Sequence, residues 1–209
     1  EEIVGRAIRG RQDQAVIATK CGIWWSDARG SFNGQKDGKD TYICLRAETL
    51  RLEVEASLRR LNVDAIDLLQ VHKPAIEPQL TPVEETMGCL MDLKREGKVK
   101  AIGVSNVSME QLQTYQAHGD VDAQQFRYNM LNREADGSFL PYCSKHSIAA
   151  LTYTSLEQGL LTGKVTLDRH FDPTDFRSDA GQWMPWFKLE NLTRLLCVFD
   201  GWHELLEHY

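Results

Sequence analysis

The sequence predicts an α/β protein whose strands form a parallel β-sheet. Short apolar runs alternate with amphipathic stretches five times along the 209 residues. Such alternation favours parallel strands joined by right-handed crossovers, and nearly continuous apolar strands favour a sheet that is covered on both faces. Two architectures fit this pattern, an open doubly wound sheet and a (β/α)8 barrel. The GxGxxG fingerprint of dinucleotide-binding doubly wound sheets is absent.

The first half of the chain contains two predicted strands and two predicted helices. The run AVIAT, residues 15–19, is the first strand, and a long polar segment follows it. Apolar residues then recur at helical spacing within residues 47–62, and IDLLQV, residues 66–71, is the second strand. The next helix opens with a cap at Thr81 and ends at Gly97.

The second half repeats the alternation. The third, fourth and fifth strands are predicted at residues 99–104, 122–126 and 148–153. Helices between them are predicted from a capping box, SMEQ at residues 108–111, to about His118, and over residues 133–146. A terminal helix is predicted from residue 190 to the end of the chain. We predict a single domain over residues 1–209.

Composition excludes several functional classes. The net charge of −6 and the pI near 5.5 argue against nucleic-acid and anionic-membrane partners. No apolar run approaches the roughly 18 residues that span a bilayer, and the first residues do not resemble a signal peptide. Five scattered cysteines without metal-ligand spacing predict reduced thiols, a cytoplasmic location and no metal site. Cys21, beside Lys20, could be a reactive thiol or simply a small residue.

Polar residues stand at the end of every predicted strand. The five strands end at or near side chains that a sheet core does not need: Lys20, His72, Ser105 with Asn106, Gln125 and Tyr153. Taken singly, His72 could be a core histidine, and the Ser-Asn pair could be a turn. Because parallel strands present their carboxyl ends at one edge of the sheet, these side chains together predict a functional site.

Five stretches resemble a known family in order and spacing. They are VIATKCG, DLLQVHKP, GKVKAIGVSN, DAQQFRYNMLNRE and TYTSLEQGLLTGK. Across essentially the whole chain they are similar to the aldo-keto reductases, in particular to bacterial, methylglyoxal-reductase-like oxidoreductases. The resemblance implies a (β/α)8 TIM barrel and the reduction of small aldehydes or ketones by a nicotinamide cofactor, with NADP(H) favoured over NAD(H).

The resemblance also implies a role for each site residue. Lys20 matches the lysine that lowers the pKa of a catalytic tyrosine, and His72 matches the histidine that orients the carbonyl. Ser105, Asn106 and Gln125 match positions that bind the nicotinamide carboxamide, and Tyr153 matches the aromatic that stacks on the ring. Three further residues match the loop around the cofactor's pyrophosphate: Leu156, Gly159 and Leu161.

Two aromatic segments leave alternatives open. Trp24 and Trp25 could be apolar walls for the substrate, or they could pack beneath a long loop. The stretch RSDAGQWMPWF, residues 177–187, resembles a loop of the same family and allows the same two interpretations.

The chain also departs from the family pattern. The family's catalytic tyrosine and its aspartate partner precede the helix with which residue 1 begins, so about five of eight strands are expected, as an incomplete barrel with two open edges. We therefore expect weak cofactor affinity and negligible activity from these residues alone. An alternative is a non-catalytic binding relative that resembles the potassium-channel beta subunits of the family.

Overall fold

The computed structural model describes residues 1–202. Contacts divide the chain into two compact units. The first comprises residues 1–127 and 133–153, and the second comprises residues 128–132 and the chain from residue 154 onward. The single domain over residues 1–209 stays a prediction.

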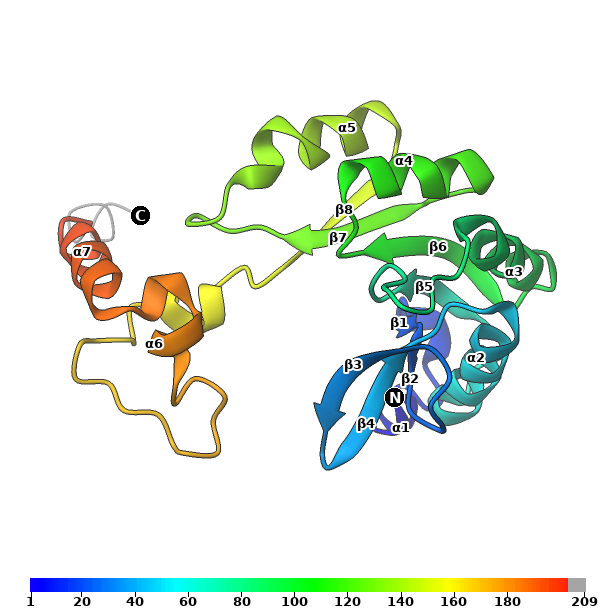
Figure 1. The fold of residues 1–209 in the computed structure, drawn as a ribbon, viewed down its shortest axis with the longest axis horizontal. Helices are drawn as coiled ribbons and strands as arrows, with labels where there is room; N and C mark the ends of the chain where they lie inside the picture. The colour runs from blue at the N-terminus through cyan, green and yellow to red at the C-terminus, as the bar shows by residue number, and fades with distance from the viewer. Residues whose placement is uncertain (203–209) are drawn as a thin grey trace. The chain divides into compact units, whose positions relative to one another are not determined.

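A five-stranded parallel sheet forms the centre of the first unit, in the order β1-β5-β6-β7-β8 (Figure 1). The strands are β1 (Ala18–Cys21), β5 (Ile66–Val71), β6 (Val99–Ser105), β7 (Ala123–Arg127) and β8 (Ala149–Tyr153). These five strands lie in the sheet in the same order as they follow one another along the chain, as strands do in the (β/α)8 barrel. Within the described residues the sheet stays open, with β1 and β8 at its edges.

Helices cover one face of this sheet (Figure 1). A short α1 (Glu2–Ala7) packs on α2, and the connections between strands carry α2 (Ala47–Leu61), α3 (Val83–Arg95), α4 (Met109–His118) and α5 (Phe139–Lys145). The apolar faces predicted for α2 and α3 are buried, with Leu50, Val54, Met87, Leu90 and Leu93 fully inaccessible. Burying each such side chain contributes about 1.5–3 kcal/mol, which makes this interface the core of the unit.

The polar segment after β1 forms a second, antiparallel sheet that the sequence interpretation left unassigned. Its strands, in the order β2-β4-β3, are β2 (Ile23–Trp24), β3 (Ser31–Lys36) and β4 (Lys39–Ile43). Asp37 and Gly38 join β3 to β4, and both have positive φ, 52° and 74°. An Asp-Gly pair with these angles is a preferred two-residue hairpin turn, so the sequence did contain a signal for this hairpin.

The second unit is built from short helices around its own apolar cluster. It contains the 3-10 turns η3 (Glu157–Thr162) and η4 (Pro185–Phe187), with α6 (Ala180–Trp183) and α7 (Leu189–Asp200). Leu160, Met184, Phe187, Leu192 and Leu195 are buried in this cluster. The predicted terminal helix is observed up to Asp200, and its last residues lie outside the described range.

The five strands and the helices between them fall close to their predicted ranges. The predicted helix over residues 133–146 is a 3-10 turn, η2 (Glu134–Gly137), followed by α5, and another short 3-10 turn, η1 (Gln12–Gln14), precedes β1. No helix that the structure describes has the length and apolar content needed to cross a bilayer.

Candidate active site

The register of the sheet places most of the predicted site residues of the first unit on one face. Lys20 pairs with Gln70, and Ser105 pairs with Gln125 across β6 and β7. Side chains alternate between the two faces along a strand, so Lys20, Ser105, Gln125 and Tyr153 point away from the helices. The opposite residues of β5 and β6, such as Leu69 and Val104, are buried under those helices.

His72 follows the last residue of β5 and is held by its backbone on both sides. Its N–H donates to the carbonyl oxygen of Cys21 at 3.0 Å, and its carbonyl oxygen accepts from Nδ2 of Asn106 at 2.9 Å. These bonds connect the ends of β1, β5 and β6. The half-buried imidazole therefore has a fixed attachment point between three neighbouring strand ends.

The electrostatic environment of His72 favours the neutral imidazole. Burial lowers the pKa of His72 below its ordinary value of 6.5, and the charges of Lys20, Lys73 and Lys36 lower it further. A neutral imidazole can donate one N–H to a carbonyl oxygen without carrying a charge of its own. The effect of the Lys20 charge also places Lys20 in the same neighbourhood as His72.

Asn106 links His72 to Tyr153. The Tyr153 hydroxyl donates to Oδ1 of Asn106 at 2.7 Å, while Nδ2 of Asn106 also donates to Oγ of Ser105 at 3.1 Å. Asn106 has φ of +58°, a left-handed conformation that asparagine tolerates better than most residues. Both ends of the Asn106 amide are thus engaged within the protein.

The residues predicted to bind the carboxamide or stack on the nicotinamide ring differ in accessibility. Ser105 is buried, at 1% exposure, whereas Gln125 is half-buried and Tyr153 is 36% exposed. A carboxamide needs one hydrogen-bond donor and one acceptor, and the amide of Gln125 offers both. The accessible ring of Tyr153 offers an apolar face for stacking. The chemistry of Gln125 and Tyr153 would suit a nicotinamide, and Asn106 holds the Tyr153 hydroxyl.

The two predicted substrate-wall tryptophans have different surroundings. Trp24, in β2, is buried, its Nε1 donates to Asp27 at 2.8 Å, and Arg29 stacks over its ring at 4.8 Å. Trp25 is 58% exposed. Packing beneath the loop, one of the two interpretations offered by the sequence, describes Trp24, and Trp25 alone has a ring accessible to a ligand.

The predicted pyrophosphate-loop residues lie in the second unit, at η3. The N–H groups of Gly159 and Leu161 both donate to the carbonyl oxygen of Leu156, at 3.0 and 3.1 Å. In this conformation the N–H groups of Gly159 and Leu161 are therefore already hydrogen-bonded within the loop. Nη1 of Arg177 donates to the carbonyl oxygen of Gln158 at 3.0 Å, so this loop has a cation beside it. In the sequence, Arg177 is marked only as the first residue of the aromatic stretch 177–187.

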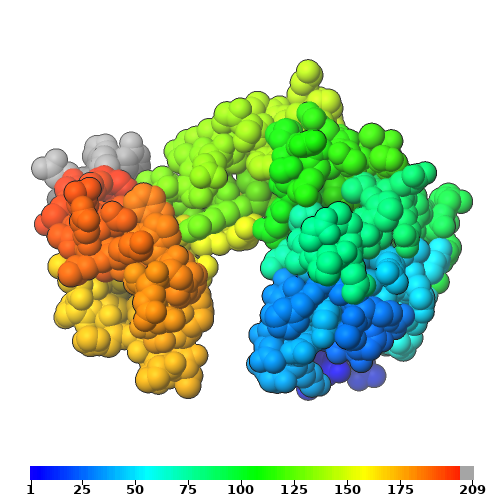
Figure 2. Space-filling model, in the orientation of Figure 1, coloured from blue at the N-terminus to red at the C-terminus, as the bar shows by residue number. Residues whose placement is uncertain are grey.

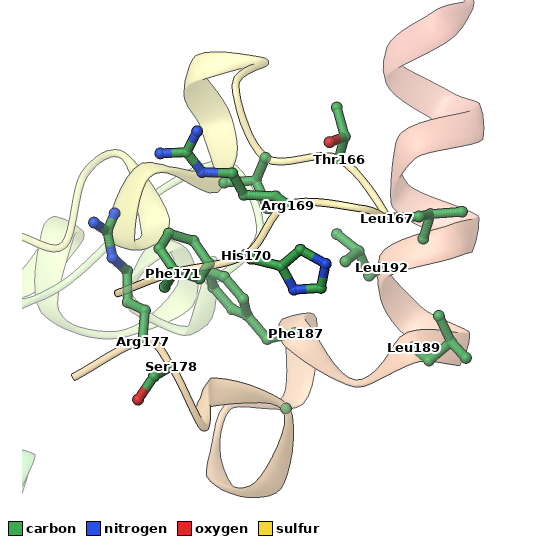
Figure 3. A pocket seen from close by; sticks show the side chains of 12 residues that line it. Thr166, Leu167, Arg169, His170, Phe171, Arg177, Ser178, Phe187, Leu189 and Leu192 are labelled. Carbon is green, nitrogen blue, oxygen red and sulfur yellow. The ribbon is translucent and has the colours of Figure 1, made fainter. Parts of the chain in front are cut away.

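The second unit also contains a cavity of about 240 Å³, and part of its lining comes from the stretch 177–187 that resembles a family loop (Figure 3). Leu189 and Leu192 line its α7 side, and Arg169, His170 and Arg177 are among its polar residues. The Arg177 guanidinium pairs with Asp175 at 2.6 Å and stacks over Phe171 at 4.4 Å. Its charge is therefore largely balanced within the unit.

One buried group, Cys21, is on the Lys20 strand, and another, Glu53, is on the helix that packs against this strand. Burial raises the pKa of the Cys21 thiol, which is 3% exposed, so the small-residue interpretation of Cys21 fits better than a reactive thiol. Glu53 of α2 accepts from the N–H of Gly22 at 2.5 Å, and its other carboxyl oxygen is buried without a partner. Burial raises the pKa of Glu53 to about 8. The sequence interpretation missed this residue because its spacing resembles that of any exposed helix acid.

In α/β barrel enzymes the catalytic residues lie at the carboxyl ends of the parallel strands. The parallel sheet of this chain has polar side chains at the same place. The Aldo/keto reductase family model matches residues 1–203. The chain belongs to the aldo/keto reductase family, and its parallel sheet and helices match those of (β/α)8-barrel reductases.

Three known proteins illustrate the similarity. The NADH-specific methylglyoxal reductase of Escherichia coli (strain K12) is 37% identical over 210 residues, which is 100% of this chain and 62% of that protein. The glycerol dehydrogenase AKR11B4 from Gluconobacter oxydans is 35% identical with a TM-score of 0.85, over 99% of this chain and 59% of that chain. An aldo/keto reductase from Klebsiella pneumoniae, solved with NADP and acetate, is 27% identical with a TM-score of 0.62, over 87% and 56%. The chain thus spans about six tenths of the length of these proteins.

Proposed function

We propose that the protein containing this chain reduces small aldehydes or ketones to alcohols with a reduced nicotinamide cofactor. The observation that carries the proposal is the convergence of Lys20, His72, Gln125 and Tyr153 at neighbouring strand ends, with Asn106 connecting His72 to Tyr153. When bound, the nicotinamide supplies the hydride that adds to the carbonyl carbon.

The proposed role of His72 follows from its neutral state. A carbonyl oxygen gains negative charge as the hydride arrives, and a fixed N–H donor stabilises that charge without losing its own proton. The lowered pKa keeps the imidazole neutral at neutral pH, so the N–H is present throughout the reaction. The backbone bonds at both sides of His72 hold the donor in place.

The proposed role of Lys20 is electrostatic. The oxygen must finally take up a proton, and the resemblance implies that a tyrosine outside residues 1–209 supplies it. An ammonium group beside a phenol favours the phenolate and so lowers the pKa of that phenol. Because this step needs the tyrosine, the activity is proposed for the whole protein and not for the 209 residues alone.

The proposed cofactor is NADP(H) or NAD(H), held by Gln125 and Tyr153 at its nicotinamide end. NADP(H) remains our preference from the sequence resemblance, and the complex of the Klebsiella protein with NADP supports it. The NADH-specific E. coli relative supports the other choice. Fluorescence titration of the whole protein with NADPH and NADH would separate them, because the preferred cofactor should bind at least tenfold more tightly.

The catalytic proposal is tested by turnover of a panel of short aldehydes by the whole protein. Replacing His72 by Gln or Lys20 by Met should lower kcat by at least a hundredfold while leaving cofactor affinity within a few-fold. Lys145→Met, at the end of α5, is a matched control that should retain full activity. Cofactor binding without any aldehyde reduction would contradict the enzymatic proposal and would favour a binding protein.

A further inference from the structure

The positive charges of three lysines act on the imidazole of His72. The charges with the largest effect on His72 are all positive and come from three elements: Lys20 from β1, Lys73 from the segment after β5 and Lys36 from the end of β3. Within residues 1–202 none of the three forms an ion pair with a carboxylate. Such a group of uncompensated cations attracts an anion.

The hairpin that carries Lys36 is attached to the segment that carries Lys73. Oγ of Ser31 donates to the carbonyl oxygen of Ile76 at 2.6 Å and accepts from the N–H of Gln79 at 2.9 Å. Nζ of Lys73 donates to Oδ1 of Asn33, on β3, at 3.1 Å. Figure 2 shows the hairpin segment, in blue, directly beside the blue-green segment that follows β5. Lys73 is therefore attached to the strand that carries Lys36, and both positive charges act on His72.

We infer that the substrate carries a carboxylate close to its carbonyl group, and that Lys73 and Lys36 bind this carboxylate while His72 binds the carbonyl oxygen. The inference rests on the proposed function, because His72 fixes where the carbonyl lies. The Lys73 ammonium donates a hydrogen bond to the neutral amide of Asn33, and an ammonium group has three N–H donors. It can therefore bind a carboxylate without giving up Asn33.

The two lysines should contribute unequally. Lys73 is half-buried, and a charge-assisted bond to a partly desolvated group is stronger than one in open solvent. Removing it should lower kcat/KM for an acidic substrate about tenfold. Lys36 is exposed, so removing it should lower the same quantity about threefold. Neither change should affect a neutral substrate by more than about twofold.

The test compares pairs of substrates with the same carbonyl and different charge. Glyoxylate and 4-oxobutanoate are assayed with the whole protein against their methyl esters, and the ratio of kcat/KM for acid over ester is the readout. The wild type should prefer both acids. Lys73→Met and Lys36→Met should reduce the ratio, whereas Lys39→Met, opposite Lys36 in the hairpin register, should leave it unchanged.

Salt provides a second readout that does not depend on the variants. Raising the ionic strength from 0.02 to 0.5 M shortens the screening length and should raise KM for the acids but not for the esters. Equal or better use of the esters, with a ratio that neither lysine variant changes, would overturn the inference while leaving the reductase proposal intact. Failure to reduce any acid or ester would instead contradict the proposed function itself.

Discussion

The Tyr153 hydroxyl donates a hydrogen bond of 2.7 Å to the side-chain oxygen of Asn106, and the same asparagine donates from Nδ2 to the carbonyl oxygen of His72 at 2.9 Å. One side chain thereby fixes the proposed stacking ring and the proposed carbonyl-binding residue to each other, across the ends of β5, β6 and β8. Asn106 therefore links the two residues directly, in addition to the pairing of the strands that carry them.

Replacing Asn106 should reduce stability and cofactor affinity together. Asn106→Gly keeps the left-handed backbone but removes the side-chain bonds to Tyr153, His72 and Ser105, at a cost of about 1–3 kcal/mol. Asn106→Ala should cost about 1 kcal/mol more, because alanine is strained at φ of +58°. Tyr153→Phe, which removes only one bond and keeps the ring, should cost about 0.5–1.5 kcal/mol. Urea unfolding and cofactor titration check the order, and equal stability of the glycine and alanine variants would contradict it.

His72 should titrate below its ordinary pKa of 6.5. Because the folded pKa is depressed, the stability from this group is fully present above pH 6.5 and is lost as the pH falls through the folded value. A ring-carbon NMR titration measures the pKa directly. Lys73→Met should raise it toward 6.5, and Lys39→Met should not change it. A wild-type value above 6.5 would show that burial and the lysine charges do not control this ring.

The sequence predicted the parallel sheet well because its signals are local and repeated. Buried residues such as Leu50 and Leu90 recur at the helical period, and each β-strand of the parallel sheet is a short apolar run between polar segments. Polar groups at the strand ends predicted where the site lies. The positions of Lys20, His72 and Gln125 after predicted strands were enough to place them together, because parallel strands all have their carboxyl ends on the same side of the sheet.

Other features depend on contacts between distant segments, which no local pattern encodes. The role of Asn106 as a bridge needs the ends of three strands in register, and the attachment of Lys36 beside His72 needs the hairpin to bond to Ile76 and Gln79. The hairpin itself had a signal in Asp37-Gly38, but its polar strands lack the alternation that marks a half-buried sheet. Glu53 has no sequence signal, since its burial arises from tertiary packing.

The two predicted helix caps behave differently, and this difference is measurable. Ser108 forms a complete capping box with Gln111, with bonds of 3.1 and 2.8 Å. At α3, by contrast, Pro82 is the N-cap and no side chain caps the helix, so Thr81 does not act as predicted. Ser108→Ala should therefore cost about 1 kcal/mol, whereas the isosteric Thr81→Val should cost less than about 0.5 kcal/mol. Urea unfolding of both variants tests this, and equal losses would contradict the assignment of the caps.

Glu53 should make the stability of the protein decrease as the pH rises. Burial raises its pKa from the ordinary value of 4.5 to about 8, so folding takes up a proton between these values. Stability from the neutral carboxyl is fully present below pH 4.5 and is lost as the pH rises to about 8, at no more than about 1.4 kcal/mol per pH unit. Glu53→Gln keeps an acceptor for the N–H of Gly22 and cannot ionise. Its unfolding free energy relative to wild type should therefore rise from pH 5 to 8 and level off above that. Glu84→Gln, at an exposed position of α3, should show no such trend, and a flat difference for Glu53→Gln would show that the carboxyl ionises normally.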